Sequence, residues 1–102
     1  MALLNEEVVI RKVVAGLARV EEGQGYEVLS YKRDRGVDML RIGPDMVRVR
    51  ERGYHQEEQT VPMVGLTRLL AAIFRREFPR STKLRLYQIN SPEQLDQPRK
   101  KL

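Results

Sequence analysis

Apolar residues recur at helical spacing in the second half of the chain. They occupy positions i, i+3, i+4 and i+7, and they comprise Met63, Leu66, Leu69, Leu70, Ile73, Phe74 and Phe78. This spacing predicts an amphipathic helix over residues 61–78, with Pro62 in its first turn and Thr60 as its cap. Pro79 ends the helix, because proline cannot continue the backbone hydrogen-bond ladder.

A second helix is predicted near the start of the chain, over residues 5–20. Asn5 suits the N-cap position, and the carboxylates of Glu6 and Glu7 suit the positive end of a helix dipole. Apolar residues follow at helical spacing, and they are Val9, Val13, Leu17 and Val20. The segment is also rich in β-branched residues, so a strand over residues 8–14 is an open alternative.

Three stretches of alternating apolar and polar residues predict strands over residues 26–33, 37–42 and 46–52. Residues 34–36 and 43–45 contain the Gly, Pro and Asp of tight turns. A two-residue turn at positions 44–45 pairs Leu40 with Val49 on the apolar face and Arg41 with Arg48 on the opposite face. The pattern does not decide which face of residues 26–33 is buried, because the turn at residues 34–36 can hold two or three residues.

The remaining segments complete an α+β domain. Residues 83–89 alternate again and predict a final strand, whereas residues 53–59 are polar and predict a loop. A further edge strand over residues 54–61 is the alternative for that loop. The predicted order is α-β-β-β-α-β, an antiparallel meander sheet with helices packed on one face, in a single domain of residues 1–90. Residues 91–102 are polar and basic, and they predict a disordered C-terminal tail.

Length and composition exclude several classes of protein. A chain of 102 residues suits one domain, and the absence of cysteine excludes disulfides, thiolate nucleophiles and Cys-based zinc sites. The apolar runs are far shorter than the roughly 18 to 20 residues that span a bilayer. Carboxylates stand near the N-terminus where a secretory signal would carry basic residues. We therefore expect a cytoplasmic protein with no membrane association.

The net charge of +5 is concentrated in the second half of the predicted meander, the long helix and the final strand. Alternation puts Arg48, Arg50 and Arg52 on one face of the third strand. If the final strand joins the same sheet, the predicted basic face comprises Arg41, Arg48, Arg50, Arg52, Lys83, Arg85 and Tyr87. Glu51 is the only acidic residue in 46–52, whereas ordinary solvated strands tend to mix signs. Arginines in such a row can bind phosphates, and a tyrosine can stack on a base. The alternative is an ordinary solvated strand face.

The long helix carries a second basic stripe. Arg68, Ala72 and Arg75 lie roughly opposite its apolar face, and Arg76 flanks them. The small side chains of Ala71 and Ala72 would let a flat partner approach. An ordinary solvated helix surface is the alternative interpretation.

Catalytic and metal-binding motifs are poorly represented. The only histidine, His55, lies near Glu57 and Glu58, and this set is too small to indicate a metal site or acid–base pair. The serines lack a nucleophile-elbow pattern, and the glycines do not form a phosphate-binding loop. Asp38 alternates with Leu40 and is expected on the apolar side, paired with Arg33. We expect no enzyme activity, no cofactor and no metal.

These observations favour a small non-enzymatic basic domain that binds RNA or DNA through its arginine rows. The alternative is a protein-interaction or homodimerisation module that uses the outer sheet face or an open sheet edge. The final strand and residues 54–61 are the expected edges.

Overall fold

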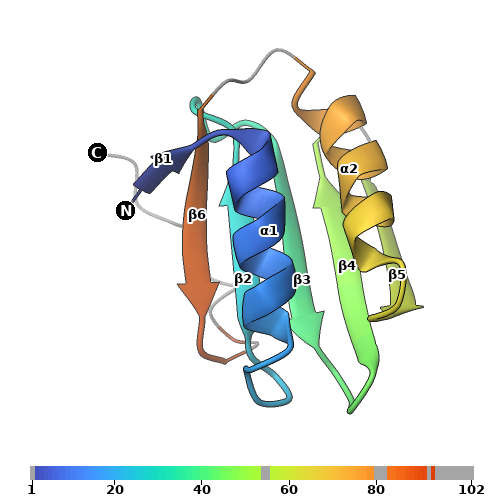
Figure 1. Cartoon of the computed structure of the whole chain (residues 1–102). Helices are drawn as coiled ribbons and strands as arrows, with labels where there is room; N and C mark the ends of the chain where they lie inside the picture. Colours follow the sequence, from blue (N-terminus) through green and yellow to red (C-terminus); the bar gives the residue numbers. More distant parts are fainter. Residues whose placement is uncertain (1, 54–55, 80–82, 92, 94–102) are drawn as a thin grey trace.

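The computed structural model describes residues 2–53, 56–79, 83–91 and 93. Six strands and two helices follow one another along this part of the chain (Figure 1). They are β1 (Ala2–Leu4), α1 (Glu6–Leu17), β2 (Gly25–Leu29), β3 (Gly36–Arg41), β4 (Met46–Arg52), β5 (Gln56–Pro62), α2 (Leu66–Glu77) and β6 (Leu84–Ile89).

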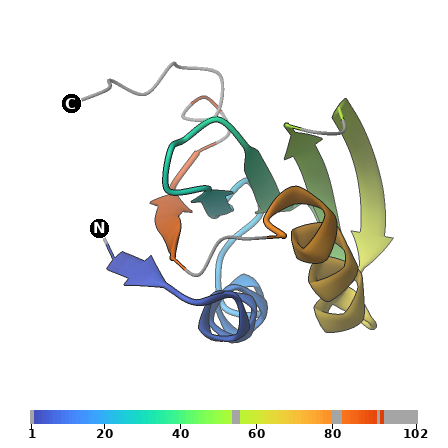
Figure 2. The same ribbon diagram turned by 90° about the horizontal axis from the view of Figure 1, so that it is seen from above.

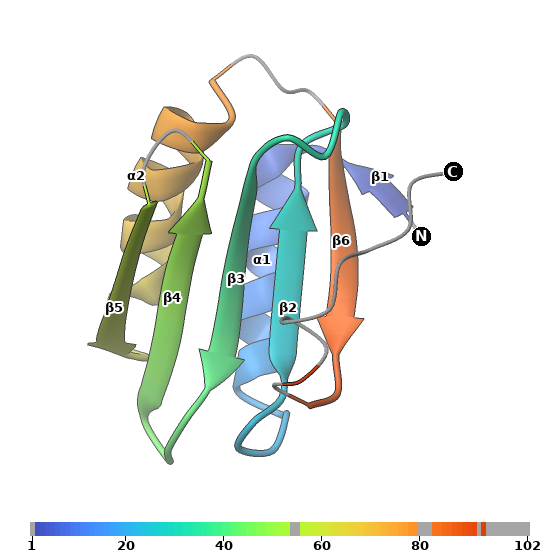
Figure 3. The same cartoon turned by 180° about the vertical axis from the view of Figure 1, so that it is seen from behind.

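The strands form one antiparallel sheet in the order β1-β6-β2-β3-β4-β5. Both helices cover the same face of this sheet, and Figure 2 shows the two layers from above. Figure 3 shows the opposite face, which carries no helix and is called the outer face below. The predicted α+β class and the meander with helices on one face are confirmed.

Two strands extend the predicted order at the sheet's edges. β5 confirms the alternative of a further edge strand after the meander, and β1 was not foreseen. β6 lies between β1 and β2, so the expectation that the final strand is an edge was wrong. β1 is only three residues long and carried too little alternation to be recognised from the sequence.

The first helix is confirmed, and the strand alternative for residues 8–14 is wrong. The side chain of Asn5 accepts a hydrogen bond of 3.0 Å from the amide of Val8, as an N-cap should. Val9, Val13 and Leu17 are completely buried against the sheet. The amphipathic pattern therefore overrides the β-branched composition, because helical spacing buries one apolar stripe.

The second helix begins later than predicted, at Leu66. Thr60 and Pro62 belong to β5, where Pro62 pairs with Met46 at the end of the edge strand. Proline is tolerated there because an edge strand leaves backbone groups unpaired. Gly65, with a φ of 82°, occupies the N-cap of α2 without a side-chain cap. The apolar face of α2 from Leu66 onward is buried as the spacing predicts.

The register between β3 and β4 differs by one residue from the prediction. Arg41 pairs with Val47 and Met39 with Val49, because four residues rather than two connect the strands. Since side chains alternate, a shift of one residue exchanges the two faces of β3. Val37, Met39 and Arg41 therefore face the helix layer.

The register also decides which face of β2 is buried under the helices. Tyr26 and Val28 pack in the main core, and Glu27 lies on the outer face. β2 ends at Leu29, four residues before the predicted end, because residues 30–35 form the turn to β3. Arg33 adopts a left-handed φ of 63° within this turn.

The main core lies between the sheet and the helices. Val28, Met39 and Val49 of the sheet belong to the same buried cluster as Leu70 and Phe74 of α2. A smaller apolar contact, between Leu40 and Ile89, lies on the outer face. Neither helix of the described chain has the length and apolar character needed to cross a membrane.

Candidate functional site

The three arginines of β4 lie in one row on the outer face. Val47 and Val49 are buried on the helix side, and Arg48, Arg50 and Arg52 occupy the half-buried alternate positions. The sequence pattern therefore places these three side chains as the structure has them. Whether they can contact a phosphate depends on what already surrounds them.

A carboxylate from β3 lies between two of these arginines. Nε of Arg50 donates a 3.1 Å hydrogen bond to Oδ2 of Asp38, and Nε of Arg52 is also 3.1 Å from that oxygen. Arg52 further donates a hydrogen bond to Glu27 of β2. The expectation that Asp38 faces the apolar core and pairs with Arg33 is wrong, because the one-residue shift puts Asp38 on the outer face.

Asp38 is completely buried although it belongs to the face without helices. Burial raises the pKa of this carboxyl, and the neighbouring charges of Arg50 and Arg52 act in the opposite direction. Its Oδ1 atom is buried and accepts no hydrogen bond within the described residues. Asp38 is therefore a buried carboxyl whose counter-charges come from two arginines of β4.

Arg48 is also close to a carboxylate. Its Nε atom lies 4.0 Å from Oε1 of Glu58 on the neighbouring strand β5. Three arginines of the row thus face three carboxylates, from β2, β3 and β5. The scarcity of carboxylates along β4, which has only Glu51, was a misleading signal, because the neighbouring strands supply carboxylates to this face.

Arg41 does not belong to the outer face, and its predicted place there is wrong. Its guanidinium donates hydrogen bonds to four main-chain carbonyls, at 2.7 Å to Pro44, 2.9 Å to Val20, 3.1 Å to Gly43 and 3.4 Å to Ala18. Ala18 caps the C-terminus of α1, where a cation is favoured by the helix dipole. Arg41 therefore joins the end of α1 to the turn between β3 and β4.

The basic residues of β6 lie apart from the arginine row. Arg85 and Tyr87 share the outer face, but β2 and β3 separate their strand from β4. Nε of Arg85 donates a 2.9 Å hydrogen bond to the carbonyl of Tyr31, and its guanidinium lies 5.0 Å from the centre of the Tyr31 ring. Lys83 is exposed just before β6. The predicted seven-residue face is therefore not one continuous patch.

The helix stripe is also divided. Arg76 donates a hydrogen bond to the buried carboxylate of Glu51 on β4, and this contact raises the pKa of Arg76. Arg68 and Arg75 are exposed, and no ion pair or hydrogen bond within the described residues engages their side chains. These two cations are available to a partner.

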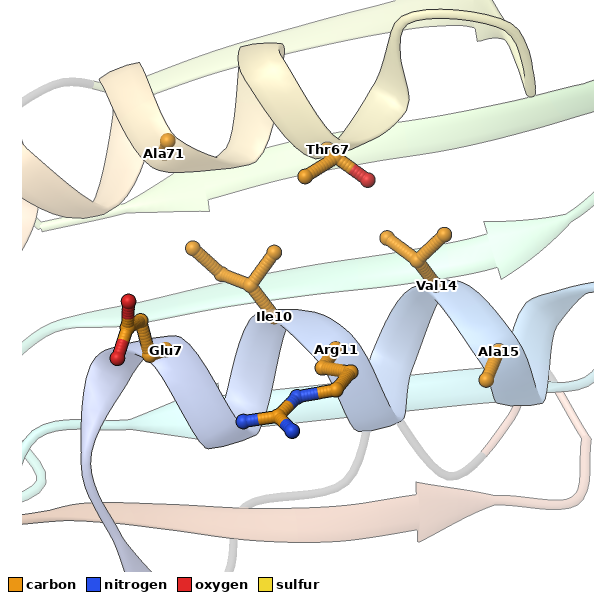
Figure 4. Close-up of a pocket in the computed structure, with 7 residues that line it drawn as sticks. All are labelled: Glu7, Ile10, Arg11, Val14, Ala15, Thr67 and Ala71. Atoms are coloured by element: carbon orange, nitrogen blue, oxygen red, sulfur yellow. The ribbon is translucent and has the colours of Figure 1, made fainter.

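A groove that the sequence did not reveal runs between α1 and α2, on the side of the helices away from the sheet. Its volume is about 470 Å³, and it is lined by Glu7, Ile10, Arg11, Val14, Ala15, Thr67 and Ala71. In Figure 4, Ile10 and Val14 point from α1 toward α2, and Thr67 points back toward α1. Apart from the charged groups of Glu7 and Arg11, the surface of the groove is almost entirely apolar.

Small residues on both helices keep this groove open. Ala15 and Thr67 are exposed, and Ala71 is half-buried. Of the two small residues expected to let a flat partner approach, Ala71 belongs to the lining and Ala72 does not. The rest of the groove was missed because it depends on how two helices pack. The available sequence signal for the groove was a pair of apolar residues, Ile10 and Val14, next to the core positions of α1.

No metal-binding group of three or more His, Asp or Glu side chains occurs within the part of the chain that the structure describes. His55 and most of the predicted C-terminal tail lie outside the described residues. No protein-family model, no curated protein and no solved structure matches this chain.

Proposed function

We propose that this protein is a non-enzymatic interaction module that binds a protein partner in the groove between α1 and α2. The observation that carries the proposal is an apolar, open depression of about 470 Å³ on the outer side of the helix layer. Exposed apolar surface of this kind is costly in water and is typical of binding sites.

The charges of the outer face favour this function over RNA or DNA binding. A phosphate that approached Arg50 or Arg52 would compete with Asp38, whose carboxylate already lies 3.1 Å from both Nε atoms. Releasing Asp38 would leave a buried carboxylate without its counter-charges, which is strongly unfavourable. The arginine row is thus better suited to hold the sheet together than to grip a nucleic acid.

The proposal is tested by selecting peptides from a displayed random library against the purified protein. Ala71→Glu puts a charge into the groove, and Ala72→Glu puts the same charge on the exposed neighbouring position as a matched control. We expect the selected peptides to lose at least about tenfold in affinity for Ala71→Glu and to bind Ala72→Glu normally. Equal binding to both variants would refute the groove as the site, provided that circular dichroism shows both are folded.

Nucleic-acid binding is tested with labelled single- and double-stranded RNA and DNA at several salt concentrations. Arg48→Gln combined with Arg50→Gln removes two cations of the row, and Arg11→Gln combined with Lys12→Gln removes two from α1. A phosphate-binding row predicts that the first pair weakens binding much more than the second. That result would favour the nucleic-acid alternative over the groove.

Homodimerisation through a sheet edge is the second candidate, and the seven-residue edge strand β5 favours it. Adjacent carboxylates of Glu57 and Glu58 and the terminal Pro62 are features that protect edges from pairing, so the groove is preferred. Sedimentation velocity separates the two. We expect a monomer, whereas a dimer that Thr60→Pro dissociates would favour edge pairing.

A further inference from the structure

The exposed cations of the helix layer indicate what kind of partner fits the groove. Arg11 of α1 belongs to the lining, and Glu7 is the only acidic residue in it. Arg68 and Arg75 lie three residues before and four residues after Ala71, so they project beside it along the rim. The apolar floor is thus bordered by cations from both helices.

The cations beside the groove differ from the arginines of the outer face, because no carboxylate of the described residues pairs with them. The side chains of Arg11, Arg68 and Arg75 are exposed and take part in no ion pair within the described residues. Arg50 and Arg52, by contrast, share the carboxylate of Asp38. The positive charge that a partner can reach near an apolar surface is therefore on the helix layer.

The groove is suited to a helix rather than to an extended peptide. An extended peptide binds by adding a strand to a sheet edge, but helices keep their backbone hydrogen bonds internal and offer no such edge. Side chains of a third helix can instead lie between the ridges of α1 and α2. The lining extends from Glu7 to Ala15, about 12 Å along the axis, which matches roughly two turns of a partner helix.

We propose that the groove between α1 and α2 binds an amphipathic helix whose apolar stripe is flanked by carboxylates. The inference rests on the proposed interaction function and specifies its partner. Apolar side chains at positions i, i+3 or i+4, and i+7 fill the groove above Ile10 and Val14. Carboxylates on the two flanks pair with Arg11 on one side and with Arg68 and Arg75 on the other.

Three labelled synthetic peptides test the proposal by fluorescence anisotropy. They share one helical apolar stripe of leucines and carry only Glu, only Gln or only Lys on the flanks. We expect the Glu peptide to bind about two- to thirtyfold more tightly than the Gln peptide, as two exposed ion pairs allow, and to weaken with added salt. The Lys peptide should bind more weakly than the Gln peptide.

A pair of double variants identifies the cations responsible. Arg68→Gln with Arg75→Gln should reduce the preference for the Glu peptide, and adding Arg11→Gln to this pair should abolish it. Lys32→Gln with Lys83→Gln removes the same total charge at two exposed positions outside the helices and should preserve the preference. The control separates a local contact from attraction by net charge alone.

The possible outcomes separate the partner from the proposed function. If the Gln peptide binds as tightly as the Glu peptide and Ala71→Glu weakens both, the groove binds helices but the acidic partner is wrong. A Glu preference that is undiminished in Arg68→Gln with Arg75→Gln overturns the assignment of the rim. If none of the three peptides binds, the helical partner is excluded, and the peptide-library selection still decides whether the groove binds another partner.

Discussion

Replacing Arg41 should destabilise the fold, although the sequence pattern places this residue on a solvent-facing surface. Its guanidinium makes four hydrogen bonds to main-chain carbonyls, and those to Val20 and Gly43 are partly buried. A hydrogen bond from a charged group contributes roughly 1.5 to 3 kcal/mol when buried, and less when water competes for the same groups. The two exposed bonds, to Ala18 and Pro44, therefore contribute little. For Arg41→Met, which retains an apolar stem, we expect the free energy of unfolding to fall by about 2 to 3 kcal/mol.

Urea denaturation followed by circular dichroism measures this change. In a domain of this size the same loss lowers Tm by about 10 to 20 °C. Arg19→Met is the matched control, because Arg19 is exposed and its side chain makes no hydrogen bond or ion pair within the described residues. It should change the stability by less than about 0.5 kcal/mol. An equally small effect of Arg41→Met would refute the reasoning and would favour the two-residue turn that directs Arg41 to solvent.

Three further changes test other parts of the structure. Asn5→Ala removes the N-cap of α1 and should lower the free energy of unfolding by about 1 kcal/mol in urea denaturation, whereas Asn5→Ser should be nearly neutral. Gly25→Ala would place a Cβ 1.8 Å from the main-chain oxygen of Met39, so the free energy of unfolding should fall by about 3 kcal/mol or more in the same assay. Gly43→Ala is the control and should be tolerated, because its Cβ would meet no atom closer than 3.8 Å. Because burial raises the pKa of Asp38 above its ordinary 3.8, the folded state keeps this proton to higher pH than the unfolded chain does. The stability of the wild type relative to Asp38→Asn should therefore be greatest below about pH 3.8 and should fall as pH rises; a relative stability that rises with pH would contradict this sign.

The candidate site shows where sequence reasoning stops. Alternation placed Arg48, Arg50 and Arg52 on one face, because the period of a strand is a local property. The carboxylates beside these arginines are Glu27, Asp38 and Glu58, all on other strands, so the charge of that face could not be read from β4 alone. The groove was missed for the same reason, since its lining belongs to two helices that are far apart in the sequence.

The sequence by itself determined the two helices, most of the strands and which face of β4 the helices cover. Amphipathic spacing specifies these elements because each must bury one apolar face. Only the tertiary structure decided the register of β3 against β4, which depends on the number of residues in the turn. A shift of one residue moved Arg41 to the helix side and brought Asp38 among the arginines. Carboxylates on neighbouring strands pair with the arginines of β4, although the sequence of β4 alone suggests an excess of positive charge. The accessible cations near an apolar surface therefore lie on the helix layer.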